Sequence, residues 1–133
     1  MQLKLDKSFR KSPEMQKKSL EFALLAAKTN KKLVYYVFNV GWIYQYIGDY
    51  TNAIEKYREC IALKPKFDKA YMNMGICYEK KGRSFSSNAF DAYSKAIEID
   101  PNFKEAVVNI KLFGKSNPEY DSKIQQILLK AKN

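Results

Sequence analysis

Residues 34–67 read VYYVFNVGWIYQYIGDYTNAIEKYRECIALKPKF, and residues 68–103 read DKAYMNMGICYEKKGRSFSSNAFDAYSKAIEIDPNF. The second segment repeats the pattern of the first. Gly41, Tyr44 and Gly48 return 34 residues later as Gly75, Tyr78 and Gly82. After two additional residues the pattern resumes, so that Ala53, Tyr57, Cys60, Ile61 and Pro65 correspond to Ala89, Tyr93, Ala96, Ile97 and Pro101. Self-similarity at such a period is typical of a fold built from stacked repeats.

The spacing of these glycines, tyrosines, alanines and prolines resembles the tetratricopeptide repeat, a helix–turn–helix unit of 34 residues. Residues 34–67 follow that pattern without a gap. The resemblance implies an all-α fold, a right-handed α-α superhelix of helical hairpins with about six or seven helices. Gly41 and Gly75 are then expected to mark close contacts between helices, with aromatic side chains filling the gaps around them.

The flanking segments are predicted to extend the same stack, as one tetratricopeptide domain over 13–133. Its predicted parts are a leading half repeat (13–33), two full repeats (34–67 and 68–103) and a degenerate repeat with a capping helix (104–133). Residues 1–12 are predicted to form a basic N-terminal arm or a short helix. Terminal repeats are commonly atypical, because one of their faces meets solvent instead of a neighbouring repeat.

Several residues predict where the helices begin and end. Ser12 and Pro13 favour a helix start, and Asp49 is a plausible N-cap for a helix over 50–63 that ends at Lys64-Pro65. Further helices are expected near 33–47, 67–81 and 87–99. The turn over 82–87 is two residues longer than the repeat requires and is expected to be a surface loop. Gly114 is expected to end the next helix as a left-handed cap.

The net charge of +10 is concentrated outside the two full repeats. Residues 1–33 carry +6, residues 34–103 carry +1, and residues 104–133 carry +3. Nucleic-acid-binding domains usually place basic residues along one face together with a recognisable motif, so this distribution argues against nucleic acid. Solvated helix faces explain the charge, and attraction to an acidic partner or an anionic membrane surface is the alternative.

The sequence indicates a soluble, intracellular and cytoplasmic protein without a catalytic function. The apolar run over 33–47 contains Asn39 and Gln45 and is shorter than a membrane span. No histidine is present, and no phosphate-binding loop or nucleophile motif is found. Cys60 and Cys77 are interpreted as buried reduced thiols that pack like small apolar residues. We therefore expect no cofactor, no metal and no small-molecule substrate; the oligomeric state is left open.

An asparagine recurs with the period of the repeat. Asn39 and Asn73 precede Gly41 and Gly75 by two residues, and Asn109 follows 36 residues later. Tetratricopeptide domains that bind peptides commonly carry such an asparagine on their inner face, and the resemblance implies the same role here. Its amide offers both a donor and an acceptor to a peptide backbone. Alternatively, each amide bridges neighbouring helices or faces solvent.

The predicted partner is therefore another protein, bound through an extended or short helical peptide in a concave groove. The candidate peptide-binding residues are Tyr35, Phe38, Asn39, Trp42, Lys69, Met72, Asn73, Ile76 and Asn109. Val108 and Leu112 are expected beside Asn109 on the same face. Two alternatives remain: Trp42 is covered by 1–11 or by the leading helix, or the chain is a structural subunit or scaffold. In that second case it packs through its terminal helices or convex face, with the groove filled internally.

Overall fold

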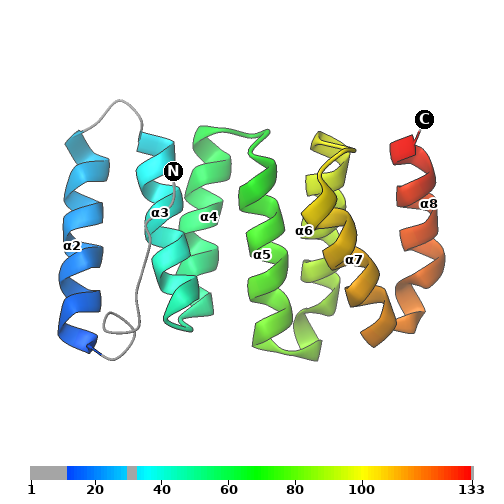
Figure 1. Ribbon diagram of the computed structural model, residues 1–133, viewed down its shortest axis with the longest axis horizontal. Helices are drawn as coiled ribbons and strands as arrows, with labels where there is room; N and C mark the ends of the chain where they lie inside the picture. The colour runs from blue at the N-terminus through cyan, green and yellow to red at the C-terminus, as the bar shows by residue number, and fades with distance from the viewer. Residues whose placement is uncertain (1–11, 30–32, 133) are drawn as a thin grey trace. The chain divides into compact units, whose positions relative to one another are not determined.

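The computed structural model describes residues 12–29 and 33–132, which form seven α-helices and two short 3-10 helices (Figure 1). The all-α fold of helical hairpins predicted from the sequence is confirmed. The chain divides into two compact units, Met1–Pro65 and Lys66–Asn133, and each is described by itself. The predicted arm over 1–12 lies outside the described residues except for Ser12. Within the described part, no helix has the length and apolar character needed to cross a membrane.

The first unit contains α2 (Pro13–Thr29), α3 (Leu33–Tyr46) and α4 (Tyr50–Leu63). The predicted helix starts are confirmed by their caps. Ser12 Oγ accepts the Met15 N–H at 3.3 Å, and Asp49 Oδ1 accepts the Asn52 N–H at 3.2 Å. Such side-chain caps satisfy backbone donors that have no partner inside the helix. At the other end of α4, Lys64 is the C-cap, as predicted.

The core of the first unit lies between its three helices. Val40 and Ile43 of α3 have no exposed surface, and Leu20 and Leu24 of α2 pack against them. The leading helix therefore covers one side of α3 with apolar side chains. α4 contributes Tyr57, which is also fully buried.

Close contact between α3 and α4 depends on Gly41. A Cβ atom built on Gly41 would lie 2.9 Å from Tyr57 Cε1, which is closer than carbon atoms approach. The Tyr57 hydroxyl donates to Gln45 Oε1 at 2.6 Å, one helical turn after the glycine. The expected role of this glycine as a marker of a close helix contact is therefore confirmed.

The second unit contains α5 (Asp68–Lys81), η1 (Arg83–Phe85), α6 (Ser86–Ile99), α7 (Lys104–Ser116), η2 (Pro118–Tyr120) and α8 (Asp121–Lys132). The hairpin of α5 and α6 repeats the construction of α3 and α4. A Cβ on Gly75 would lie 2.5 Å from Tyr93 Cε1. The Tyr93 hydroxyl donates to Glu79 Oε1 at 2.5 Å.

The turn with the two-residue insertion lies at the surface, as expected, but it forms a short 3-10 helix instead of an irregular loop. Gly82 turns the chain with a φ of 126°, a region that favours glycine, and the next three residues form η1. Phe85 stacks on Tyr78 with ring centroids 6.0 Å apart. Because this aromatic side chain packs back onto α5, the inserted residues are held as a helical turn that leads directly into α6.

The expectation for Gly114 is wrong. α7 continues through Gly114 to Ser116, and among the described residues only Gly48 and Gly82 have a positive φ. The helix ends instead at Asn117, whose N–H donates to the carbonyl oxygens of Phe113 and Gly114. A Cβ on Gly114 would lie 2.8 Å from Ile124 Cδ1. This glycine therefore allows α8 to approach α7 and does not provide a left-handed cap.

Aromatic packing holds the end of the second unit together. Phe113 of α7 is 1% exposed and contacts Tyr93 and Tyr120 with ring centroids 6.2 and 5.2 Å apart. Phe90 of α6 lies 4.9 Å from the Tyr120 ring. Aromatic pairs at such distances stabilise by about 0.5–1.5 kcal/mol each beyond the area they bury. The degenerate third repeat is thus attached to α6 through the repeat tyrosine Tyr93 and through Phe90, which the repeat pattern does not contain.

Candidate functional site

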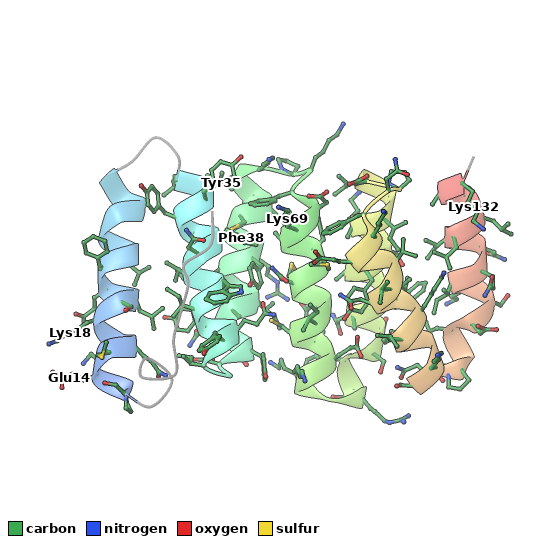
Figure 2. The ribbon with its side chains drawn as sticks, viewed as in Figure 1. Glu14, Lys18, Tyr35, Phe38, Lys69 and Lys132 are labelled. Atoms are coloured by element: carbon green, nitrogen blue, oxygen red, sulfur yellow. The ribbon has the colours of Figure 1, made fainter. Side chains whose placement is uncertain are left out.

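Four of the predicted site residues lie on one face of α3 in the first unit. Tyr35, Phe38, Asn39 and Trp42 follow each other at intervals of three, one and three residues, the spacing of one helix face. We call these four residues the α3 strip. Figure 2 labels two of them, Tyr35 and Phe38, near the first turns of α3. Tyr35 is 40% exposed, Trp42 is half-buried, and Phe38 and Asn39 are buried.

The aromatic members of the α3 strip have partners within their own unit. The Phe38 ring lies 5.5 Å from the Tyr57 ring, so Phe38 belongs to the hairpin core. Trp42 stacks on Tyr46 with ring centroids 5.3 Å apart and packs against the cluster around Val40. Lys64 Nζ lies 5.6 Å from the centre of the Tyr35 ring. The exposed edge of the strip is therefore formed by Tyr35 and part of Trp42.

Asn39 is the unusual member of the strip. Its side chain is 4% exposed, and Oδ1 is a buried oxygen without a hydrogen-bond partner among residues 12–29 and 33–132. A buried acceptor left unpaired costs about 1–3 kcal/mol relative to a paired one. Such groups are rare in native structures and call for an explanation. Within the described part of the chain, no neighbouring helix supplies a donor for this oxygen.

The second unit carries the equivalent strip on α5. Lys69, Met72, Asn73 and Ile76 have the same spacing, and we call them the α5 strip. Lys69 is exposed near the first turn of the helix (Figure 2), Ile76 is half-buried, and Met72 and Asn73 are each 7% exposed. As on α3, the two central positions are buried while the first position reaches solvent.

Asn109 lies on α7 of the same unit and is half-buried. Beside it, Val108 and Leu112 are each 54% exposed, one helical turn apart. Two large apolar side chains at this spacing form an exposed apolar edge on α7. The third asparagine is therefore next to apolar surface, as expected, but in a more open setting than Asn39 or Asn73.

The structure thus places the predicted residues on three helix faces, α3 in the first unit and α5 and α7 in the second. Their assignment to peptide binding stays a prediction. Sequence reasoning missed Gln45 and Glu79, which accept the hydrogen bonds of the repeat tyrosines. A signal was present, because both acceptors follow their repeat glycine by four residues.

The two cysteines are free and buried, in agreement with their interpretation as packed thiols. Burial raises the pKa of the Cys77 thiol to about 12. The pKa of Cys60 is also raised to about 12, first by burial and second by the nearby Glu59 carboxylate. The Cys60 thiol donates to the Val34 carbonyl oxygen at 3.6 Å. Both thiols are therefore held protonated and unreactive, since the thiolate is the nucleophilic form.

The helical hairpins repeat a glycine–tyrosine contact and carry recurring strips of partly exposed residues. This architecture is that of a helical-repeat protein. Comparison with known protein families identifies the kind of repeat. A model described as TPR repeat matches residues 41–82, and a model described as Tetratricopeptide repeat matches residues 68–103. Residues 41–103 therefore consist of tetratricopeptide repeats, and such repeats are protein–protein interaction modules.

Two curated relatives match over 50 and 48 residues. The Photosystem I assembly protein Ycf3 of Prochlorococcus marinus is 36% identical over 50 residues, 38% of this chain and 29% of that protein. The protein of the same name from Cyanophora paradoxa is 38% identical over 48 residues, 36% of this chain and 28% of that protein. The matched part of the chain thus spans less than a third of the length of either relative.

A solved structure described as the crystal structure of MamA is similar over a larger part of the chain. The alignment covers 95% of this chain and 83% of MamA, with a TM-score of 0.63 and 22% sequence identity. At this identity the similarity concerns the fold. It agrees with the helical-repeat architecture derived from the sequence.

Proposed function

We propose that this chain binds an extended or short helical peptide segment of a partner protein, as a non-catalytic adaptor. The α3 strip is the candidate contact surface of the first unit, and the α5 strip with Asn109 is that of the second. Tyr35 and Lys69 present exposed side chains, Trp42 and Ile76 present half-buried ones, and the asparagines supply hydrogen bonds. Tyr and Trp are residue types enriched where binding energy is concentrated in protein interfaces.

The observation that carries this proposal is the unpaired Oδ1 of Asn39. Peptide backbone N–H groups are the donors that an extended ligand offers in abundance. A donor reaches this oxygen when side chains above it turn aside, which is a common adjustment at interfaces. The position recurs as Asn73 on α5, which is similarly buried, so the second unit has an amide at the equivalent place. The names of the curated relatives, which are assembly proteins, support a role in holding other polypeptides.

The test compares binding with folding in the same variants. Peptides selected by phage display on the wild-type chain are titrated, and Trp42 fluorescence reports binding because it is the single tryptophan. Asn39→Ala and Asn73→Ala are each expected to weaken binding by roughly 1–3 kcal/mol. Asn39→Ala is also expected to leave the free energy of unfolding unchanged or higher, because it removes an unpaired buried acceptor and places a better helix former.

Asn88→Ala is the matched control, because Asn88 is an exposed asparagine on α6, outside the strips. It should change neither binding nor stability. If Asn39→Ala and Asn73→Ala weaken folding as much as binding, the amides are structural and the proposal fails. Equal affinities in all three variants would also contradict it.

A second candidate function is a structural subunit that packs through its terminal helices into a larger assembly. Three exposed apolar side chains favour it: Met15 and Phe22 of α2 are 49% and 74% exposed, and Leu129 of α8 is 62% exposed. Large apolar side chains in water are commonly covered by partners when they cluster. This function predicts that Phe22→Glu prevents incorporation into the assembly while peptide titrations at Trp42 stay unchanged.

A further inference from the structure

A groove lies between α7 and α8 in the second unit, separate from both strips. It has a volume of about 500 Å³ and lies beside the start of α7 and the end of α8. Its lining combines the apolar residues Val107, Leu128, Leu129 and Ala131 with the polar residues Asn102 and Gln125. Lys111 and Lys132 also line it, the latter labelled near the end of α8 in Figure 2.

This groove is unexpected in a capping unit. A terminal repeat needs a polar outer face to stay soluble, and the sequence predicts that α8 is a capping helix. Instead, Leu128 is half-buried and Leu129 is 62% exposed on the flank of α8 that lines the groove. The side chains at 107 and 111 of α7 face the same groove. Two neighbouring helix flanks with apolar side chains form a surface on which a further helix can pack.

The charge of the groove indicates which kind of partner helix it can bind. The described residues that line it include two lysines and neither Asp nor Glu. Neither Lys111 nor Lys132 forms an ion pair within 12–29 and 33–132. Over 104–133 the chain carries +3. A helix with acidic residues beside its apolar stripe would place carboxylates next to these two ammonium groups.

The same charge argues against occupants from this protein itself. Residues 1–11 contain four basic residues and one acidic residue, so this segment would bring like charge to the groove. A second copy packed groove to groove by a two-fold axis would bring Lys111 and Lys132 of both copies into one interface. Both arrangements would bury positive charges together without compensation, which is costly.

We propose that the α7–α8 groove binds an acidic amphipathic helix of a partner protein. Leucine-like side chains of that helix cover Val107, Leu128 and Leu129, and its flanking carboxylates pair with Lys111 and Lys132. The proposal does not depend on the peptide-binding role of the α3 and α5 strips. A partner held at both surfaces would be bound more tightly than by either alone.

The test uses the full chain and designed helical peptides. The probe has leucines on one face flanked by glutamates, and its matched control has lysines in place of the glutamates. Binding is followed by methyl NMR of Val107, Leu128 and Leu129. The acidic peptide is expected to shift these methyl signals and to lose affinity as salt is added. The lysine peptide is expected to leave them unchanged.

Two charge-matched variants locate the contact. Lys111→Glu with Lys132→Glu is expected to weaken binding of the acidic peptide roughly ten-fold or more. Lys115→Glu with Lys130→Glu changes the net charge equally, at exposed positions outside the groove lining, and should have a much smaller effect. Thermal unfolding of both variants checks that the unit is intact.

Three outcomes would overturn the proposal. Equal weakening in both variants would mean a general charge attraction. Methyl shifts that increase with protein concentration, without peptide, would show that a second copy fills the groove. A response at Trp42 without a response at Leu129 would move the acidic peptide to the α3 strip. Failure of the peptide titrations at Asn39 and Asn73, by contrast, leaves this groove proposal unaffected.

Discussion

The hairpins α3–α4 and α5–α6 use the same contact between their helices but differ in its tightness and in its hydrogen-bond acceptor. A Cβ on Gly41 would lie 2.9 Å from the tyrosine ring, whereas a Cβ on Gly75 would lie 2.5 Å from it. Tyr57 donates to the amide oxygen of Gln45, and Tyr93 donates to the carboxylate of Glu79. The comparison shows that the repeat pattern specifies a glycine, a tyrosine ring and an acceptor, but not the charge of that acceptor.

The charged acceptor has consequences for the second hairpin. Burial raises the pKa of Tyr93 far above its ordinary value, and the Glu79 carboxylate raises it further. The phenol is therefore held in its neutral, donating form. Hydrogen bonds to a charged acceptor are roughly twice as strong as neutral ones. We expect the α5–α6 hairpin to depend more strongly on its tyrosine than the α3–α4 hairpin does.

Removal of the tyrosine rings should give the largest effects. Tyr93→Ala and Tyr57→Ala are each expected to lower the free energy of unfolding by about 3–5 kcal/mol, as for other buried aromatic residues. The loss should be larger for Tyr93, because its hydroxyl donates to a carboxylate, whereas the hydroxyl of Tyr57 donates to a neutral amide. Urea denaturation, monitored by circular dichroism, measures the total loss in the free energy of unfolding. Amide hydrogen exchange shows in which of the two units the loss occurs. A larger loss for Tyr57 would contradict the ranking of the two hairpins.

Substitution of the glycines tests the difference in tightness. Alanine gains about 1 kcal/mol over glycine in a helix interior, while overpacking costs about 1–3 kcal/mol. Gly75→Ala meets three atoms of the Tyr93 ring within 2.9 Å and should be clearly destabilising. Gly41→Ala should be milder, because only one ring atom lies within 3.0 Å. Denaturation midpoints check the order, and Gly41→Leu should damage the first hairpin in the same assay.

Much of this architecture could be predicted from the sequence because the repeat places its constraints locally. The start of α2 at Pro13, the cap at Asp49 and the end of α4 at Lys64 follow from the chemistry of nearby residues, and the structure confirms them. The close contacts at Gly41 and Gly75 could be predicted because each glycine recurs with its tyrosine. Helix-capping chemistry and the repeat period were therefore sufficient to predict these helix ends and helix contacts.

The remaining features depend on contacts that no local rule contains. Gly114 has the sequence signature of a helix cap, but the approach of Ile124 from α8 decides its role. The sequence of the insertion after Gly82 predicts a loop, but Phe85 stacks on Tyr78 and this contact stabilises a helical turn. For the candidate site, spacing predicts which residues share a face of α3 or α5. It does not predict that Asn39 is buried with an unpaired oxygen, because burial depends on the neighbouring helices.

The buried thiols provide a test at alkaline pH. The folded pKa values of Cys60 and Cys77 are raised to about 12 from an ordinary value near 9.0. The unfolded chain therefore releases these protons first as pH rises, and stability present below pH 9 is lost above it. At pH 10 each thiol should contribute a loss on the order of 1 kcal/mol. Urea titrations at pH 8 and pH 10 measure this loss.

The control for the thiol effect is Cys60→Ala with Cys77→Ala, which keeps Tyr93 and all other groups that titrate at high pH. Alanine is the residue that the next repeat has in place of Cys60, at Ala96. The variant should lose less stability between the two pH values than the wild type. An identical pH dependence in both proteins would show that the thiols are not held protonated by the fold.

Gly114→Ala should have the smallest effect and separates the third hairpin from the first two. At Gly41 and Gly75 the obstacle is a buried aromatic ring, but at Gly114 it is the terminal Cδ1 of Ile124, the end of a flexible side chain. The Ile124 side chain can rotate to move Cδ1 aside. The cost of this rotation offsets part of the gain of about 1 kcal/mol that alanine brings to a helix interior. The free energy of unfolding should therefore change by no more than about 0.5 kcal/mol, in either direction. A loss of about 1 kcal/mol or more would instead be expected if this glycine had a positive φ, because alanine is strained there. Denaturation of Gly114→Ala beside Gly75→Ala thus distinguishes a glycine needed for space from one needed for backbone conformation.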